Sequence, residues 1–128
     1  MTALVLDTHA ALWWSFFPEK LSDTAAKALD QAETLVFPAI LFWEVALLVR
    51  KRRLELPRSP AAWLRELRSI SRAKVVSLSA ALALRADQLE MHADPADRFI
   101  VATALQSGVP LVTKDAAIRS AKLVRTIW

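Results

Sequence analysis

Short, largely apolar segments recur along this chain, and each is followed by a longer stretch in which the apolar residues have helical spacing. These segments are residues 3–6, 35–37, 75–78, 111–113 and 123–127. Short continuous apolar runs are typical of strands that are buried on both faces of a parallel sheet. Because strands and helices alternate along the whole chain, the sequence predicts an α/β fold with three layers, α/β/α, and a mainly parallel central sheet.

Capping residues and helix breakers set the expected bounds of the helices. Ser22 or Asp23 begins one helix, and Ser59 followed by Pro60 is a typical start for another. Gly108, the only glycine, is expected to end a helix. The predicted helices cover residues 8–17, 22–32, 39–52, 60–70, 79–90 and 94–107, with a short one after Asp115. No linker or repeat interrupts them, so we expect one domain over residues 1–128.

Cysteine is absent from the sequence, and the only histidines are His9 and His92. The lack of cysteine excludes disulfides, thiolate nucleophiles and cysteine-based zinc sites. Two histidines are too few for a histidine-rich metal site. Any metal ion would therefore be held by oxygen atoms, which favours hard cations such as Mg²⁺ or Mn²⁺.

The charge balance favours a polyanionic partner. The formal net charge is +4 and the sequence pI is about 10.0, although the chain contains 13 acidic residues. The amino terminus lacks the pattern of a signal peptide. The longest apolar stretch, residues 35–49, contains Pro38 and Glu44 and is shorter than the ~20 residues of a membrane span. We therefore expect a soluble, cytoplasmic protein.

Three aspartates lie where the carboxyl ends of parallel strands would place them. Asp7 directly follows the first predicted strand, Asp115 follows the fourth, and Asp97 lies in the first turn of a helix. Ligands bind at this edge of an open parallel sheet, so the three are candidates for a shared site. Each also has a structural explanation. Asp7 and Asp115 are favoured helix caps, and Asp97 has the spacing of a capping-box partner of Asp94.

Glu44 has no such structural explanation, because it lies in the middle of a predicted helix. Its neighbours on both sides, residues 40–43 and 45–49, are all apolar, which predicts a buried helix. An unpaired charge in such a place costs several kcal/mol. Two interpretations stay open: an ion pair with an arginine such as Arg98, or a metal ion shared with other carboxylates. Converging carboxylates repel one another, and a divalent cation would neutralise them and activate water against a phosphodiester.

The acidic residues lie in four recognisable segments. Residues 4–9 read LVLDTH, residues 42–46 FWEVA, residues 92–104 HADPADRFIVATA and residues 111–115 LVTKD. In this order they resemble the motifs of the PIN-domain family, and more narrowly its VapC-like toxin branch. The third segment resembles the specific H-x-D-P-x-D-R motif, and the likeness extends over nearly the whole chain. The resemblance implies a PIN-like fold and a Mg²⁺- or Mn²⁺-dependent endoribonuclease that cuts single-stranded or loop RNA by water attack.

The same resemblance implies roles for individual residues and partners. The catalytic and metal-binding residues would be Asp7, Glu44, Asp97 and Asp115, and supporting residues would be Thr8, Thr113, Asp94 and Arg98. Thr8 and Thr113 have ordinary alternatives as a helix cap and a strand residue. The toxin branch further implies a homodimer and a cognate antitoxin protein that blocks the site. Relatives often carry a glycine in the turn after the helical glutamate, where this chain has a run of basic residues instead.

That run comprises Arg50, Lys51, Arg52 and Arg53. These cations would contact RNA phosphates, or they would simply lie in solvent at the end of a helix, where the macrodipole favours positive charge. Adjacent Trp13 and Trp14 cannot point the same way on a helix, so at least one of them is a candidate for an interface.

Other functions stay open at this point. A housekeeping RNA-processing nuclease would share the fold and site but lack an antitoxin gene beside its own. A catalytically silent binding module would keep the carboxylates without using them. A phosphoacceptor receiver domain fits poorly, because Asp7 has no acidic neighbour and no aspartate follows residues 75–78.

Overall fold

The computed structural model describes residues 2–128, so Met1, the first residue of the predicted domain, lies outside the described part of the chain. The five-stranded sheet has the order β3-β2-β1-β4-β5, and each neighbouring pair is parallel. The strands are β1 (Ala3–Leu6), β2 (Thr34–Pro38), β3 (Ala73–Val76), β4 (Leu111–Val112) and β5 (Thr126–Ile127). The predicted parallel α/β sheet is confirmed.

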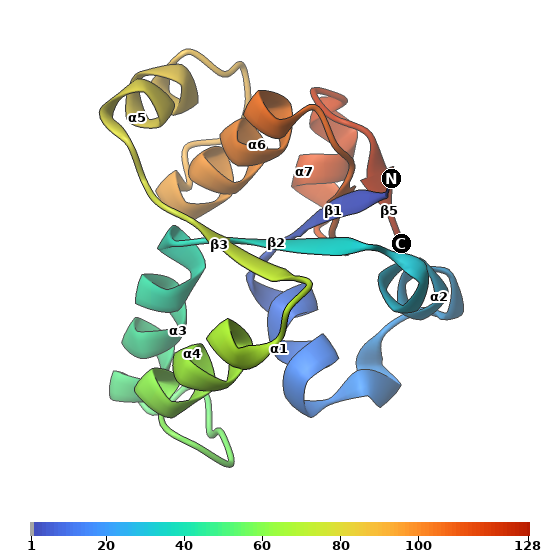
Figure 1. Cartoon of the computed structure of the whole chain (residues 1–128). Coiled ribbons are helices and arrows are strands. Elements are labelled where there is room, and N and C mark those ends of the chain that lie inside the picture. The colour runs from blue at the N-terminus through green and yellow to red at the C-terminus, as the bar shows by residue number, and fades with distance from the viewer. Residues whose placement is uncertain (1) are drawn as a thin grey trace.

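Helices cover both faces of this sheet and complete the three predicted layers (Figure 1). One face carries α1 (Thr8–Phe16), α2 (Asp23–Gln31), α3 (Ile40–Arg50) and α4 (Pro60–Ser69). The other face carries α5 (Ala80–Asp87), α6 (Pro95–Ser107) and α7 (Ala116–Ala121). A short 3-10 helix, Pro18–Lys20, lies between α1 and α2.

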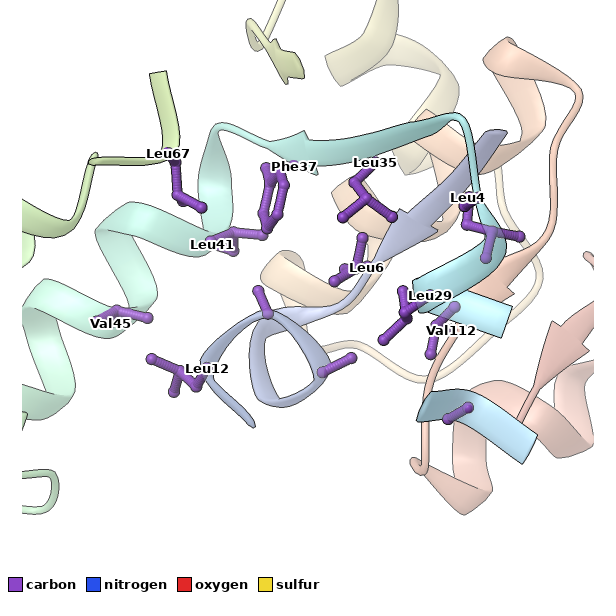
Figure 2. Packing of buried hydrophobic residues seen from close by; sticks show 14 of the residues in the cluster. Leu4, Leu6, Leu12, Leu29, Leu35, Phe37, Leu41, Val45, Leu67 and Val112 are labelled. Carbon is purple, nitrogen blue, oxygen red and sulfur yellow. The ribbon is translucent and has the colours of Figure 1, made fainter. Parts of the chain in front are cut away.

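Alternate side chains of the central strands enter the cores on opposite faces of the sheet. Leu6 of β1 and Phe37 of β2 pack with α1 to α4, as Figure 2 shows. Val5 and Val36, one residue before them, pack instead with α6 and α7. Each of these side chains stabilises the fold by about 1.5–3 kcal/mol when fully buried. Burial on both faces explains why the strands are continuous apolar runs rather than alternating ones.

Side-chain caps begin several helices at the predicted residues. The hydroxyl groups of Ser22, Ser59 and Ser79 accept hydrogen bonds from backbone N–H groups three residues later, at 3.0, 3.2 and 3.1 Å. Each such bond satisfies a donor that the helix itself leaves unpaired. Gly108 ends α6 with a φ of 68°, in the left-handed region that glycine favours.

The predicted third strand was placed two residues too far along the chain. It pairs with β2 from Leu35 opposite Ala73 to Pro38 opposite Val76. The chain of β2 then turns into α3, so Ser77 and Leu78 have no strand beside them. Leu78 is accordingly 44% exposed.

Two predicted helices are shorter than expected. Helix α3 ends at Arg50 because the N–H groups of Arg52 and Arg53 turn back to the carbonyls of Val49 and Leu48, with Arg52 in the left-handed region at a φ of 57°. This is the pattern of a Schellman cap. Helix α5 ends at Asp87 rather than at Glu90, and the Arg98 side chain, described below, donates hydrogen bonds to carbonyls at this end. No helix within residues 2–128 is both long enough and apolar enough to cross a membrane.

Candidate active site

The carboxyl ends of β1 and β4 lie at the point where the strand order of the sheet reverses. From β1 the chain builds outward through β2 to β3, and then returns to the other side of β1 for β4 and β5. Ligand sites of open α/β sheets lie just beyond the strands at such a switch point. Asp7 follows β1 and Thr113 follows β4, so both residues are located there.

Asp7 is a buried carboxylate at this switch point, with only 6% of the residue exposed. One of its oxygens, Oδ1, accepts a hydrogen bond from the N–H of Ala10 at 2.8 Å and thereby caps α1. The other, Oδ2, accepts a hydrogen bond from the hydroxyl of Thr113 at 2.5 Å. Burial raises the pKa of Asp7 to about 6, although both hydrogen bonds act to lower it. The predicted cap is therefore present, but it occupies only one oxygen.

Glu44 projects from the second turn of α3 and accepts a hydrogen bond from the Thr8 hydroxyl. It is half-buried, and α3 is less buried than its apolar sequence predicts, because Trp43 beside it is 58% exposed. Burial raises the pKa of Glu44, and the nearby charges of Asp94 and Asp97 raise it further.

Asp97 lies in the first turn of α6, where its Oδ2 is 2.6 Å from Nε2 of His92. Asp94 caps this helix by accepting a hydrogen bond from the N–H of Asp97 at 3.1 Å. The side chain of Asp97 contacts His92, and within residues 2–128 no hydrogen bond joins it to the N–H of Asp94, so only one half of the predicted capping box is formed. Burial raises the pKa of Asp97, the contact with His92 lowers it, and the charges of Asp94 and Asp115 raise it.

Asp115 is exposed and caps α7 through a hydrogen bond from the N–H of Ile118 at 2.9 Å. Its own N–H donates to Oγ1 of Thr113 at 3.0 Å. Thr113 therefore links the carboxylate of Asp7 to the backbone N–H of Asp115. The four predicted acidic residues thus lie in one neighbourhood, joined through threonine hydroxyls or through their charges.

The oxygen donors of this neighbourhood suit a divalent cation. Within residues 2–128, no three aspartate, glutamate or histidine side chains already form a group that would hold a metal ion. Instead, Asp7, Glu44 and Asp97 each contact a threonine hydroxyl or a histidine ring. The charge of Asp97 raises the pKa of both Asp7 and Glu44. A cation would relieve this repulsion, and carboxylate oxygens are the ligands that Mg²⁺ and Mn²⁺ prefer.

Comparison with known proteins identifies the family. The PIN domain family matches residues 4–123, a range that includes Asp7, Glu44, Asp97 and Asp115. The chain belongs to the PIN domain family. Ribonuclease VapC22 of Mycobacterium tuberculosis (strain ATCC 25618 / H37Rv) is 38% identical over 130 residues, covering 100% of both chains.

Two solved structures share the PIN fold at low sequence identity. VapBC2 from Rickettsia felis, bound to a DNA fragment from the promoter, has a TM-score of 0.69 at 16% identity, covering 98% of this chain and 97% of that chain. VapC20 of Mycobacterium tuberculosis, a sarcin-ricin loop cleaving toxin, has a TM-score of 0.68 at 18% identity, covering 94% and 96%. At these identities the two structures support the fold alone.

Arg98 of this PIN domain is engaged with the backbone rather than with Glu44. Its guanidinium donates to the carbonyls of Ala86, Leu89, Met91 and His92 at 3.0, 2.9, 2.8 and 3.1 Å. These bonds satisfy carbonyls at the end of α5 and fix the segment that carries His92. The suggested ion pair between Arg98 and Glu44 is wrong, because the structure records no such pair among residues 2–128. Arg98 therefore holds the backbone between α5 and α6.

The basic run Arg50, Lys51, Arg52 and Arg53 is exposed at the carboxyl end of α3. At 1.5 Å of rise per residue, Arg50 lies roughly 9 Å along the helix axis from Glu44. The helix that presents Glu44 to the PIN site therefore ends in a cluster of solvated cations. This placement is compatible with a role in gathering RNA and with a purely solvated helix end.

Sequence reasoning gave no site role to two of the three further residues that line a cavity beside Asp7 and Asp115, and it gave the third, Trp13, only as one of two candidates for an interface. The three residues are His9, Trp13 and Lys114. His9 and Trp13 follow Asp7 on α1, and Lys114 directly precedes Asp115, so each is close in sequence to an acidic motif of the PIN domain. Closeness in sequence to these motifs was the one feature of the sequence that could have marked the three residues as candidates for the site.

Proposed function

We propose that this PIN domain is a metal-dependent endoribonuclease that hydrolyses RNA phosphodiester bonds, and that it is the toxin of a type II toxin–antitoxin pair. The main support is the buried Asp7 at the switch point of the sheet. Thr113 links its carboxylate to the backbone N–H of Asp115, and the charge of Asp97 raises its pKa. Full-length similarity to a protein named as a ribonuclease supports the same reaction for this chain.

Asp7, Glu44 and Asp97 would hold Mg²⁺ or Mn²⁺, with Asp115 as a fourth carboxylate. When bound, the ion would orient a phosphodiester, lower the pKa of a water molecule and stabilise the leaving oxygen. The hydroxyls of Thr8 and Thr113 fix the carboxylates of Glu44 and Asp7 by donating to them. His92 restrains Asp97 in the same way. These contacts limit the rotation of the carboxylates, which keeps the cost of ordering a metal site small.

The cations of residues 50–53 would hold the RNA backbone while the acidic site acts on it. A basic surface around an acidic centre attracts the polyanion over a wide area, whereas the metal permits its close approach to the carboxylates. The excess of Lys and Arg over Asp and Glu, which gives the net charge of +4, is consistent with this division of roles.

The proposed partners are an antitoxin protein and a second copy of the chain. Structures with similar folds include toxin–antitoxin complexes, such as one from Klebsiella pneumoniae at 18% identity and a TM-score of 0.64. A small gene beside that of this chain, whose product suppresses RNA cleavage by the purified protein, would distinguish a toxin from a housekeeping nuclease. Light scattering of the purified protein would establish whether it is a dimer.

The decisive experiment is cleavage of a mixed, structured RNA in Mg²⁺, in Mn²⁺ and in EDTA. Wild type should be compared with Asp7→Asn, with Asp97→Asn and with Asp30→Asn, the last an exposed aspartate on α2 that serves as the matched control. We expect metal-dependent cutting by wild type and by Asp30→Asn that both site variants lose. Equal cutting by all four proteins would indicate a contaminating nuclease and would count against the proposed site. Metal binding measured by calorimetry without RNA provides a readout that is independent of activity.

A further inference from the structure

A cavity beside the carboxylates is lined by aromatic and basic side chains that the proposed hydrolysis does not use. Its volume is about 330 Å³, and its walls are Asp7, His9, Trp13, Lys114 and Asp115. This volume lies at the lower end of the ~300–1,000 Å³ typical of small-molecule sites. The cavity therefore connects the acidic switch point of the sheet with the ring of Trp13.

Trp13 is placed differently from its neighbour Trp14. Both rings pack against the core that α1 to α4 form on one face of the sheet. The ring of Trp14 lies 6.0 Å from that of Phe37, between centroids. The ring of Trp13 lies 5.5 Å from that of His9 and 5.6 Å from that of Trp128. Trp13 and Trp14 are both partly buried, and His9 is exposed. Of the two tryptophans, Trp13 lines the cavity beside Asp7 and Asp115, and Trp14 does not.

We propose that this cavity receives one unpaired nucleobase of the RNA substrate, stacked on Trp13, while Lys114 contacts the adjacent phosphate. The proposal rests on the ribonuclease function proposed above and names the part of the substrate that this site selects. Proteins commonly bind single-stranded RNA by stacking its bases on aromatic side chains, and they hold the backbone with cations. Here both groups lie next to the carboxylates proposed to act on the phosphodiester.

Lys114 indicates which of two ligands, an arginine of a partner protein or a nucleotide, fits this acidic and aromatic cavity better. Its Nζ lies 5.8 Å from the centroid of the Trp13 ring. An arginine from a partner protein would stack on Trp13 and pair with the carboxylates, but it would meet the positive charge of Lys114. A nucleotide offers a base to the ring and an anionic phosphate to the ammonium group. Because an exposed cation–π contact is weaker than base stacking, a base is able to displace the Lys114 ammonium toward the phosphate.

The test is a double-mutant cycle between the protein and the RNA. Binding of labelled RNA hairpins, in which one loop nucleotide at a time is abasic, is measured by fluorescence anisotropy in Mg²⁺. A Glu44→Gln background keeps the RNA intact. Trp13→Leu should weaken binding of the unmodified hairpin by about 5- to 150-fold, the range expected for loss of one stacked base. At one loop position, the abasic substitution should cause a similar loss, and the two losses should not add.

Trp13→Phe keeps an aromatic face and should restore most of the binding, whereas Trp43→Leu, the same change at an exposed tryptophan outside the cavity, should show no coupling to that loop position. A purely structural role of Trp13 in packing against Trp128 would weaken binding without coupling to a single nucleotide. Additive losses at every loop position would therefore overturn the proposal. Unchanged RNA binding by Trp13→Leu would also overturn it, and would favour an arginine of a partner protein as the occupant of the cavity.

Lys114→Gln tests the same cavity without altering α1, should Trp13→Leu fail to fold. It should reduce the slope of log affinity against log salt by about one, while Lys27→Gln, at an exposed lysine on α2, should leave the slope unchanged. Equal slopes for the two variants would overturn the phosphate contact. Cleavage by the protein without the Glu44 substitution is scored separately. Coupling between Trp13 and one loop nucleotide, without cleavage, would refute the nuclease function and retain the base-binding cavity. Cleavage without such coupling would refute the base-binding cavity and retain the nuclease function.

Discussion

Replacing Asp7 by asparagine should stabilise the folded protein progressively, relative to wild type, as the pH rises toward neutrality, even though it removes a proposed metal ligand. Burial raises the pKa of Asp7 from 3.8 to about 6 in the folded state. Between these values the folded protein binds more protons at Asp7 than the unfolded chain does, so the contribution of this group to stability falls as the pH rises. That contribution is fully present below the unfolded pKa and is lost as the pH passes through the folded pKa. Asparagine does not ionise and has no such loss.

The magnitude follows from the two pKa values. At 1.36 kcal/mol per pKa unit, ionisation of Asp7 costs the folded state about 3 kcal/mol once the pH exceeds both values. Part of the unfolded-state ionisation occurs below pH 4, so about 2–3 kcal/mol of this cost should develop between pH 4 and pH 7. The hydrogen bonds that asparagine alters, with Ala10 and Thr113, add an offset that does not depend on pH.

The assay is urea unfolding at intervals from pH 4 to pH 8 in EDTA, with wild type, Asp7→Asn and the exposed control Asp30→Asn. The free energy of unfolding of Asp7→Asn, minus that of wild type, should increase as the pH rises and should level off above pH 7. The difference for Asp30→Asn should stay flat. A pH-independent difference for Asp7→Asn, or one that moves toward wild type, would refute the argument that burial of this carboxylate is a cost.

Three further changes test how helices α3, α5 and α6 end. Arg52→Gly should stabilise the protein by about 1 kcal/mol in thermal unfolding, because arginine occupies a left-handed position with a φ of 57°. Gly108→Ala should destabilise the protein by about 1 kcal/mol, because alanine would have to adopt the left-handed conformation at a φ of 68°. No steric clash should add to this cost, because an added Cβ meets nothing within 4 Å. Arg98→Met should cost about 3 kcal/mol or more by leaving carbonyls at the end of α5 without their charged donor. A smaller loss for Arg98→Met than for Gly108→Ala would contradict its assignment as a helix-end cap. Finally, Mg²⁺ added to the urea titrations should stabilise wild type above pH 6 and have less effect on Asp7→Asn, because the ion binds the ionised carboxylate; equal stabilisation of both would exclude Asp7 from the metal ligands.

The sheet and the places of the carboxylates were predictable because both follow from local rules. Apolar runs buried on two faces define the strands, and a residue directly after a parallel strand lies at the carboxyl edge. Asp7 and Asp115 could be assigned to that edge in this way. The helix starts at Ser22 and Ser59 were equally local, since one side chain and one N–H decide each of them.

Features that depend on contacts distant in sequence were not predictable from local rules. The order of the strands, and hence the switch point between β1 and β4, is set by how the layers pack rather than by any one segment. The bounds of β3 depend on where β2 turns into α3. The carbonyls at and after the end of α5 bind Arg98, which lies on the next helix and donates hydrogen bonds to four of them. The exposure of Trp43 shows that an apolar helix at the side of a small domain is not buried all round.

Asp7 and Asp115 together separate capping from function at this site. Each accepts a hydrogen bond from the N–H three residues later, at 2.8 and 2.9 Å, so the two make equivalent caps. Asp115 does so while exposed, which shows that a cap in this fold needs no burial. Asp7 is buried, its pKa is raised, and it takes a second hydrogen bond from Thr113. Capping does not account for that additional cost, whereas the proposed metal ion would offset it, because it would bind and stabilise the ionised carboxylate that burial disfavours.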